Sequence, residues 1–292
     1  MKRILCIADS CCDLIFGGLD RLPGLGEEIY GSHFSMQAGG GANTAVLLAK
    51  CGVPTAFWTL LGDDLPGQIV RDTLTKSGVE LVLHGQTAAR TPVSAVLSTR
   101  EDRAFASFAE ESSLVEDTDA LEKAIKSADL VHTFLGYCMA YPIAALCEKH
   151  GVLLSLDSSF CDATPDAFRA VLPHCDYYKG NEPEACRLTG AKNAEEALKA
   201  LCNQVRKGAV ITRGARGSIG MERGGTRIVQ AAVDRGPFRD ACGAGDAYAA
   251  GFLSGLANGC AFSECMRRGA VLAGQVVTAY GGCPETICFL PE

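Results

Sequence analysis

The sequence predicts an α/β fold in which a mainly parallel sheet is covered by helices on both faces. Short apolar runs typical of buried strands alternate along the chain with segments of helical periodicity. This alternation is typical of a doubly wound sheet, because parallel strands need long crossover connections, which are usually helices. The expected strands are 2–8, 54–62, 128–136, 151–157, 175–180 and 208–214, and the expected helices are 65–78, 118–128, 141–151 and 193–208.

The first of these strands, 2–8, is uninterrupted by polar residues except at its start, which suits the middle of a buried sheet. Near the C-terminus, two small-residue helices are expected at 243–259 and 262–282. Glycines follow each of them, at Gly259 and at the Gly281–Gly282 pair, and glycine after a helix is an ordinary stop signal.

Two further segments, 27–37 and 91–110, interrupt the alternation with period-2 patterns and no helix between strands. The second is expected to be a hairpin that turns at Arg100–Arg103. We expect a small β element formed from about 13–37 and 91–110 to project from the body as a lid or a dimer contact. No linker rich in Pro, Gly or Ser divides the chain, so residues 1–292 are expected to form one domain.

The composition argues against several functions. With 48% hydrophobic and 21% charged residues, the chain is typical of globular proteins, and a net charge of -7 with scattered basic residues disfavours nucleic acid and membrane surfaces as partners. Asp9 and Asp13 interrupt the apolar N-terminus, which disfavours a signal peptide, and no apolar run is long enough to span a membrane. We expect a cytoplasmic protein.

The 15 cysteines contain no CxxC pair, and most have apolar neighbours, as Cys6, Cys51, Cys147, Cys186 and Cys202 do. We therefore expect reduced thiols that pack as small hydrophobic groups. The five histidines are dispersed and lack metal-ligand spacing.

The segment 239–252, RDACGAGDAYAAGF, is predicted to be a strand-to-helix turn that binds an anion. Gly243, Ala244 and Gly245 would present backbone N–H groups at a helix start, where negative charge is favoured. Asp246 follows directly and would repel a phosphate bound there as a ligand. It suits phosphoryl transfer instead, in which the turn holds the moving group and Asp246 accepts the proton of the attacking hydroxyl.

Other interpretations of this segment stay open. Asp246 also fits a helix-capping acid, and Asp240 fits an ordinary turn residue. Cys242 at the helix start would be a nucleophile only if His132 or His174 approached it in the fold.

A second glycine-rich segment, 38–52, supports a ligand site. Gly39 and Gly40 would let a ligand approach the backbone, and Asn43 offers one acceptor and two donors to a polyhydroxylated substrate. Asn43 also fits a helix N-cap, which does not exclude binding.

Together these segments resemble the ribokinase-like, or PfkB, family of carbohydrate and nucleoside kinases. DACGAGD (240–246) resembles the C-terminal signature of the family, close to DTxGAGD, and GGGANTA (39–45) resembles its N-terminal glycine and asparagine motif. Asn181 and Glu184 match the family's NxxE pattern, and the segment from Ile211 to Gly220 resembles the one that passes the nucleotide. The resemblance covers essentially the whole chain.

The resemblance implies a three-layer α/β/α body with a β-sheet lid and Mg-ATP as phosphoryl donor. It also implies that Asp246 is the base. Several site roles are implied in addition, and these are the anion hole at Gly243, Ala244 and Gly245, substrate contacts at Asp13, Gly39, Gly40 and Asn43, nucleotide contacts at Thr212 and Gly214, and Mg²⁺ held through water at Asn181 and Glu184.

Two further implications concern partners. In some members, an aspartate and two threonines of the C-terminal signature belong to a loop that binds K⁺. Asp240 matches that aspartate, but Ala241 and Cys242 stand in place of the threonines. Members of the family often pair through their lids, which suggests a homodimer.

Ribokinases commonly carry Asn at the position of Cys11 and Lys at that of Gly40, so the resemblance is to the family and not to ribokinase itself.

The leading hypothesis is an ATP-dependent kinase of a small sugar or sugar derivative. A nucleoside kinase is the alternative, for which Phe105 and Phe108 would stack on a base or else pack the lid. A non-catalytic sugar-binding regulator is a third hypothesis, disfavoured because a binder needs no base. Arg90, Arg103 and His84 would bind an acidic sugar or else be solvated.

Overall fold

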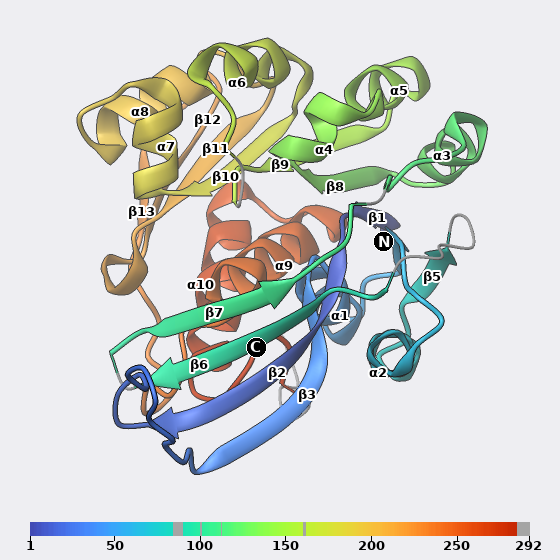
Figure 1. The fold of residues 1–292 in the computed structure, drawn as a ribbon. Helices are drawn as coiled ribbons and strands as arrows, with labels where there is room; N and C mark the ends of the chain where they lie inside the picture. Colours follow the sequence, from blue (N-terminus) through green and yellow to red (C-terminus); the bar gives the residue numbers. More distant parts are fainter. Residues whose placement is uncertain (84–89, 100, 112, 160–161, 285–292) are drawn as a thin grey trace.

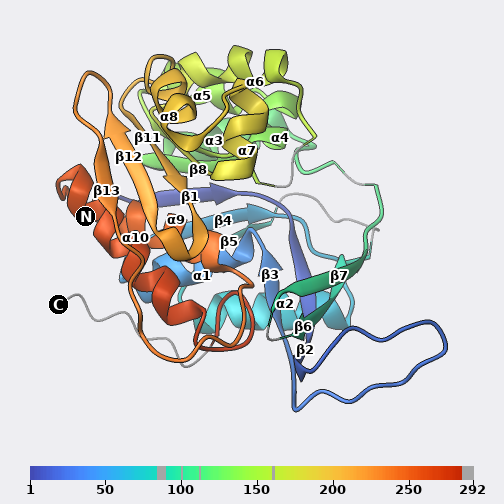
Figure 2. The same cartoon turned by 90° about the vertical axis from the view of Figure 1, so that its left-hand side faces the viewer.

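Strand β1 (Ile4–Ile7) lies in the interior of a nine-stranded sheet, as its apolar sequence predicts. In this computed structural model, helices cover both faces of that sheet, and a separate four-stranded sheet projects from one side (Figures 1 and 2). The structure describes residues 1–83, 90–99, 101–111, 113–159 and 162–284. The predicted α/β/α body with a small β-sheet lid is therefore confirmed.

The central sheet has the order β13-β12-β11-β10-β9-β8-β1-β4-β5, and all neighbours pair in parallel except β11 with β12 and β12 with β13. The two antiparallel strands at one edge are not predicted from the sequence. Besides β1, the strands are β4 (Thr55–Thr59), β5 (Glu80–Leu83), β8 (Leu130–Phe134), β9 (Leu153–Asp157), β10 (Tyr177–Asn181), β11 (Gly208–Thr212), β12 (Ser218–Glu222) and β13 (Ile228–Gln230).

One helical layer packs on the face that β1 presents through Leu5 and Ile7, and the other packs on the face of Ile4 and Cys6. The first layer contains α3 (Thr118–Lys126), α4 (Leu135–Ala140), α5 (Ile143–His150), α6 (Pro165–Val171), α7 (Glu182–Thr189) and α8 (Ala194–Cys202). The second contains α1 (Ala42–Lys50), α2 (Leu65–Lys76), α9 (Ala244–Ala257) and α10 (Phe262–Val276).

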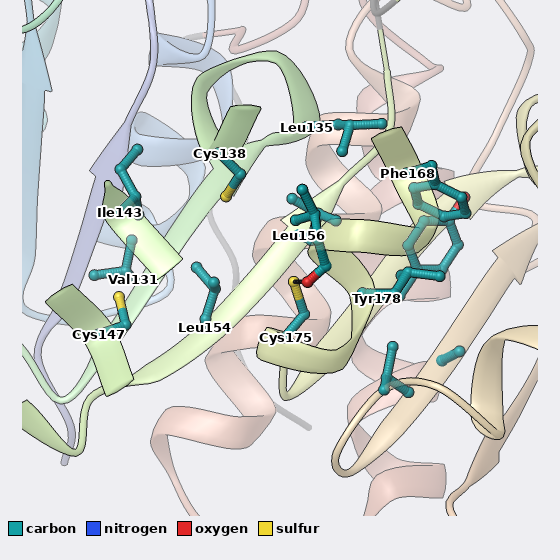
Figure 3. Close-up of a cluster of buried hydrophobic side chains, with 14 of the residues drawn as sticks. Val131, Leu135, Cys138, Ile143, Cys147, Leu154, Leu156, Phe168, Cys175 and Tyr178 are labelled. Atoms are coloured by element: carbon teal, nitrogen blue, oxygen red, sulfur yellow. Dashed lines mark hydrogen bonds between the residues drawn. The ribbon is translucent and has the colours of Figure 1, made fainter. Parts of the chain in front are cut away.

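Cysteines contribute to the core of the first layer as small apolar groups. Cys138, Cys147 and Cys175 lie among Leu154, Leu156 and other aliphatic and aromatic side chains (Figure 3). Burial raises the pKa of the Cys147 thiol to about 12, so it stays protonated. The cysteines of the described residues are free, as expected, and in that part of the chain no group of three or more His, Cys, Asp and Glu side chains is arranged to hold a metal ion.

The lid has the strand order β3-β2-β6-β7, with β2 (Ser10–Leu19), β3 (His33–Gly40), β6 (Val93–Thr99) and β7 (Arg103–Phe108). Strand β2 begins three residues before the expected position 13, and β3 ends three residues after 37. Position 100 lies outside the described residues. Arg103, expected in the hairpin turn, is already part of β7 and pairs with Ser98.

Helix α10 ends at Val276, earlier than the expected 282. Beyond it the chain turns so that Gly281, with a φ of +88°, donates its N–H to the Asp240 carboxylate. Helix α8 likewise ends at Cys202. Arg206 and Lys207, just before β11, donate backbone hydrogen bonds to the carbonyls of Cys175 and Asp176, just before β10. In both places a tertiary hydrogen bond ends the helical pattern.

Among the described residues no helix is long and apolar enough to cross a membrane.

Candidate active site

Helix α9 begins with the predicted glycine turn, but a loop (231–242) and not the expected strand precedes this turn. Gly243 has a φ of +72°, and a β-carbon there would overlap the backbone of Gly282, so only glycine fits. The Ala244 N–H closes the turn by donating to the Ala241 carbonyl. The next amides start the helix, where N–H groups have no partner within the helix and attract negative charge.

Asp246 lies in the first turn of α9 and faces the start of α1. The Asn43 side-chain amide donates to its Oδ2 at 3.1 Å, and the Thr44 hydroxyl donates to its Oδ1 at 3.3 Å. Burial raises the pKa of the Asp246 carboxyl to about 6, the positive charge of Lys179 lowers it, and Asp157 raises it. The two glycine-rich segments, about two hundred residues apart in sequence, therefore meet at this carboxylate.

Asp13 extends the site onto the lid. It is buried on β2, directly across from Gln37, and a β-carbon on the neighbouring Gly39 would overlap its carboxylate. Burial raises the pKa of Asp13 to about 6, a hydrogen bond from the Cys11 thiol opposes this, and the charges of Asp246 and Asp240 add to it. Gly39 is thus glycine because Asp13 occupies the space beside it.

Gly40 has a φ of +63° and closes β3 against the backbone carbonyl of Asp9. Gly41 follows as the N-cap of α1, so this turn sets the position of Asn43 in the first turn of that helix. Asn43 is buried, and its Oδ1 has no hydrogen-bond partner among the described residues. An acceptor that is free beside the Asp246 carboxylate suits a ligand hydroxyl.

Lys179 and Asp157 form a buried ion pair beneath the start of α9, which sequence reasoning missed. Their Nζ and Oδ2 atoms are 2.8 Å apart on the adjacent strands β10 and β9. Burial lowers the pKa of Lys179, but Asp157, Asp246 and Glu184 outweigh it and hold the pKa above its usual value. A β-carbon on Gly245 would lie 3.2 Å from Lys179 Nζ, so the ammonium group adjoins the glycine turn.

Asn181 and Glu184 form a capping box at the start of α7, where β10 ends. Asn181 Oδ1 accepts the Glu184 N–H at 2.9 Å, and Glu184 Oε2 accepts the Asn181 N–H at 3.1 Å and the Ser158 hydroxyl at 3.3 Å. Burial raises the pKa of Glu184. The pair therefore holds the helix start and places a half-buried carboxylate near Lys179.

Thr212 and Gly214 line a cavity of about 340 Å³ together with Ala244 and Gly245 of the α9 turn. Its other walls come from residues 215–248 and from α10, and they include Val233, Phe238 and Tyr248. The lining contains no charged side chain. The cavity is thus an apolar space that opens beside the turn and suits a flat, uncharged ring.

Asp240 is buried and braces the loop before α9. Its Oδ1 accepts the Cys242 N–H at 2.9 Å, and its Oδ2 accepts the Gly281 N–H at 3.0 Å. These bonds hold the glycine turn against the segment after α10.

The cysteine interpretation of this segment is not supported. Cys242 packs against Ile15 and Val96 of the lid, and burial and nearby carboxylates raise the pKa of its thiol. The two histidines considered as partners bond elsewhere, His132 to Ser155 and His174 to Glu148.

Comparisons with known proteins show the family to which the chain belongs. The family model described as pfkB family carbohydrate kinase matches residues 1–287. The chain is 28% identical over 288 residues to the ribokinase of Arabidopsis thaliana, covering 93% of this chain and 75% of that protein. It is 26% identical over 294 residues to the fructoselysine 6-kinase of Shigella flexneri, covering 96% and 99%.

Solved structures show the same architecture. The structure of the Arabidopsis thaliana ribokinase complexed with ribose and ATP matches with a TM-score of 0.80 and 25% identity, covering 97% of this chain and 95% of that one. The adenosine kinase of Sinorhizobium meliloti shares the fold, with a TM-score of 0.84 at 22% identity, covering 98% and 96%. The chain belongs to the pfkB family of carbohydrate kinases, and family membership makes it a phosphotransferase that uses ATP.

Proposed function

We propose that the protein transfers the γ-phosphoryl group of Mg-ATP to a hydroxyl of a small sugar or sugar derivative, with Asp246 as the general base. One observation carries the proposal. The Asp246 carboxylate, whose pKa is about 6, lies in the first turn of α9 beside Asn43 and Thr44, next to the glycine turn that suits an anion. A carboxylate with a pKa near neutrality is a more effective base than an ordinary exposed one.

In this mechanism, Asp246 accepts the proton of the attacking hydroxyl while Asn43 and Thr44 hold its two oxygens. The amides of Gly243 and Gly245 stabilise the charge on the moving phosphoryl group, and the Ala244 amide is shared with the turn. Lys179 adds a positive charge beside Gly245. The attacking hydroxyl, which loses its proton and accepts the phosphoryl group, would thus meet a fixed, partly desolvated set of groups.

Asp13, Gly39, Gly40 and Asn43 are proposed to hold the other sugar hydroxyls. What supports this is the buried Asp13 carboxylate, the absence of a side chain at Gly39, and the unpartnered Asn43 Oδ1. Among the relatives, ribokinases and fructoselysine 6-kinases are matched over most of this chain, which favours a monosaccharide or a sugar conjugate over a nucleoside.

The nucleotide is proposed to bind with its base in the cavity lined by Thr212 and Gly214 and its phosphates toward the α9 turn. Asn181 and Glu184 would hold Mg²⁺ through water, and their oxygen donors are of the kind that Mg²⁺ prefers. When bound, the ion neutralises charge on the phosphates.

We also propose that K⁺ binds beside the buried Asp240 carboxylate, which is tested by comparing turnover in K⁺ and in Na⁺.

The decisive experiment is Asp246→Asn, assayed with sugars, sugar acids, amino-sugar conjugates and nucleosides. We expect kcat to fall by roughly 10²-fold or more, because the base is lost. The melting temperature and the Kd for Mg-ATP should stay close to wild type. Turnover of Asp246→Asn near the wild-type rate would contradict the mechanism. If wild type prefers nucleosides in the panel, the substrate class is nucleosides and not sugars.

The lid is proposed to mediate a homodimer. On the lid face opposite to Ile15 and Val96, the side chains of Phe16, Phe34, Met36 and Phe108 are between 38% and 56% exposed, an apolar surface that a second copy would cover. We also propose a cytoplasmic location, which the free thiols of the described residues support.

A further inference from the structure

The lid face that turns toward the body carries polar groups that the proposed mechanism does not use. Val96 on this face packs against Ile15 and Cys242, so Ser98, two residues further along β6, faces the same way. Arg103 on β7 is directly opposite Ser98 and shares its face. Ser98 and Arg103 therefore lie on the inner face of the lid, several residues beyond Asp13.

Three hydrogen-bonding groups on this face are buried without a partner in the described part of the chain. They are Gln37 Nε2, Ser98 Oγ and Arg103 Nε. Ser98 as a whole is only 1% exposed. Each of these groups donates hydrogen bonds, and a buried donor left unpaired is costly, so such groups normally have a partner or await a ligand.

The charge of Arg103 is only partly used inside the protein. Its Nη1 is 3.0 Å from Asp102 Oδ1, but the Asp102 side chain is 76% exposed, and an ion pair to such a group contributes little. Burial and nearby carboxylates raise the pKa of Cys242, and Arg103 partly offsets them, so its positive charge reaches toward the α9 loop. The opposite end of the site holds the acids Asp13 and Asp246.

We propose that the acceptor substrate carries an anionic group, a carboxylate or a phosphate, at the end remote from the reacting hydroxyl, and that Arg103 and Ser98 bind it. The acids Asp13 and Asp246 accept hydrogen bonds from the hydroxyl end of the substrate. The unpaired donors of Ser98 and Arg103 bind its anionic end, which accepts hydrogen bonds. Arg103 is thereby a specificity-determining residue. This inference rests on the proposed kinase function, of which it names the substrate class.

The test compares sugars in matched pairs that differ by one anionic group. Galactose is paired with galacturonate, fructose with fructose 1-phosphate, and 1-deoxy-1-butylaminofructose with its 4-carboxybutylamino analogue. These pairs distinguish a carboxylate from a phosphate and a short reach from a long one. For each pair, kcat and KM are measured at saturating Mg-ATP with wild type, Arg103→Met, Arg103→Lys and Ser98→Ala.

Arg90→Met is the matched control. Arg90 is also a lid-region arginine, but it pairs with Glu110 and lies over the ring of Phe108, which is on the outer face. In wild type we expect at least one acid to be preferred over its neutral partner. Arg103→Met should lower that preference roughly tenfold or more through a higher KM for the acid. Arg103→Lys should restore part of it, and Arg90→Met should not change it.

Equal use of both members of every pair by wild type would overturn the inference while leaving the kinase function intact. So would an acid preference that Arg103→Met does not reduce. A second readout does not depend on turnover, since the Nε–Hε resonance of Arg103 is followed by NMR during titration with the same sugars. If no sugar is phosphorylated, the proposed function fails. Anion binding at Arg103 is then still supported if only the acids shift this resonance, and it is overturned if they do not.

Discussion

Asp246 differs from an ordinary helix-capping aspartate because of what surrounds it. Asn43 and Thr44 donate to its oxygens, Lys179 supplies a positive charge, and burial opposes ionisation. The net effect is a pKa of about 6, which leaves the carboxylate ionised at neutral pH but ready to take a proton.

The pH dependence of turnover should report this environment. A base must be ionised to act, so kcat/KM for the acceptor should fall as the pH drops through about 6, the pKa of Asp246 and of Asp13. Above that range kcat/KM should become independent of pH. The measurement is kcat/KM from pH 4.5 to 8.5 with a stability check at each pH. A flat profile down to pH 4.5 would contradict the burial argument.

The buried pair of Lys179 and Asp157 should affect stability and turnover separately. Lys179→Met leaves the Asp157 charge buried without its partner, which costs roughly 3–5 kcal/mol for such pairs. The double variant Lys179→Met with Asp157→Leu removes both charges and should recover most of this loss in urea unfolding.

Turnover of the double variant then tests Lys179 directly. If the ammonium group stabilises the phosphoryl group beside Gly245, kcat stays low although the fold is restored. Recovery of kcat together with stability would show that the pair is structural only.

The elements of the site are held in place by close backbone contacts. Helices α1 and α9 meet with their N-termini together, and the segment after α10 lies against both. A β-carbon at Gly282 would overlap the Asn43 side chain, and one at Gly243 would overlap Gly282. These glycines set the distance between Asn43 and Asp246.

Gly282→Ala should therefore impair catalysis more than stability. The added methyl group displaces the Asn43 amide from Asp246, so kcat is expected to fall about tenfold or more, given that one catalytic hydrogen bond is worth that much. Gly52→Ala is the control. Gly52 ends the turn after α1 with a φ of +77° and has open space around it, so the alanine strains the backbone without touching the site. Equal kcat in both variants would refute the argument.

At the scale of the whole molecule, the homodimer that we propose would form through the outer face of the lid. Phe34→Glu places a charge in the centre of the apolar surface, beside the ring of Phe16 at 5.1 Å. If the lid mediates a dimer, light scattering after gel filtration should show a dimer for wild type and a monomer for this variant. Val229→Glu, on the distant edge strand β13, should remain dimeric. A wild-type monomer at micromolar concentration would refute the proposal.

Much of the fold was accessible from local sequence pattern. Strand β1 is a short apolar run, and the lid strands carry period-2 alternation, because each pattern follows from burial on two faces or on one. The edge strands β12 and β13 were missed, since β12 is short and contains Gly220, and β13 has only three residues. The end of α10 was missed because the hydrogen bond from Gly281 to Asp240 joins distant positions.

The sequence by itself determined the glycine turns, the carboxylate behind one of them and the asparagine behind the other, because turn chemistry and helix starts are local properties. Only the tertiary structure decided that Asp246 meets Asn43, that Lys179 and Asp157 pair beneath the turn, and that Arg103 and Ser98 share the inner face of the lid. Lysine within the strand run YYKGN was a usable signal, since a charge in a buried strand needs a partner. Its partner lies on a neighbouring strand, and strand pairing brings together residues that no spacing in the sequence relates.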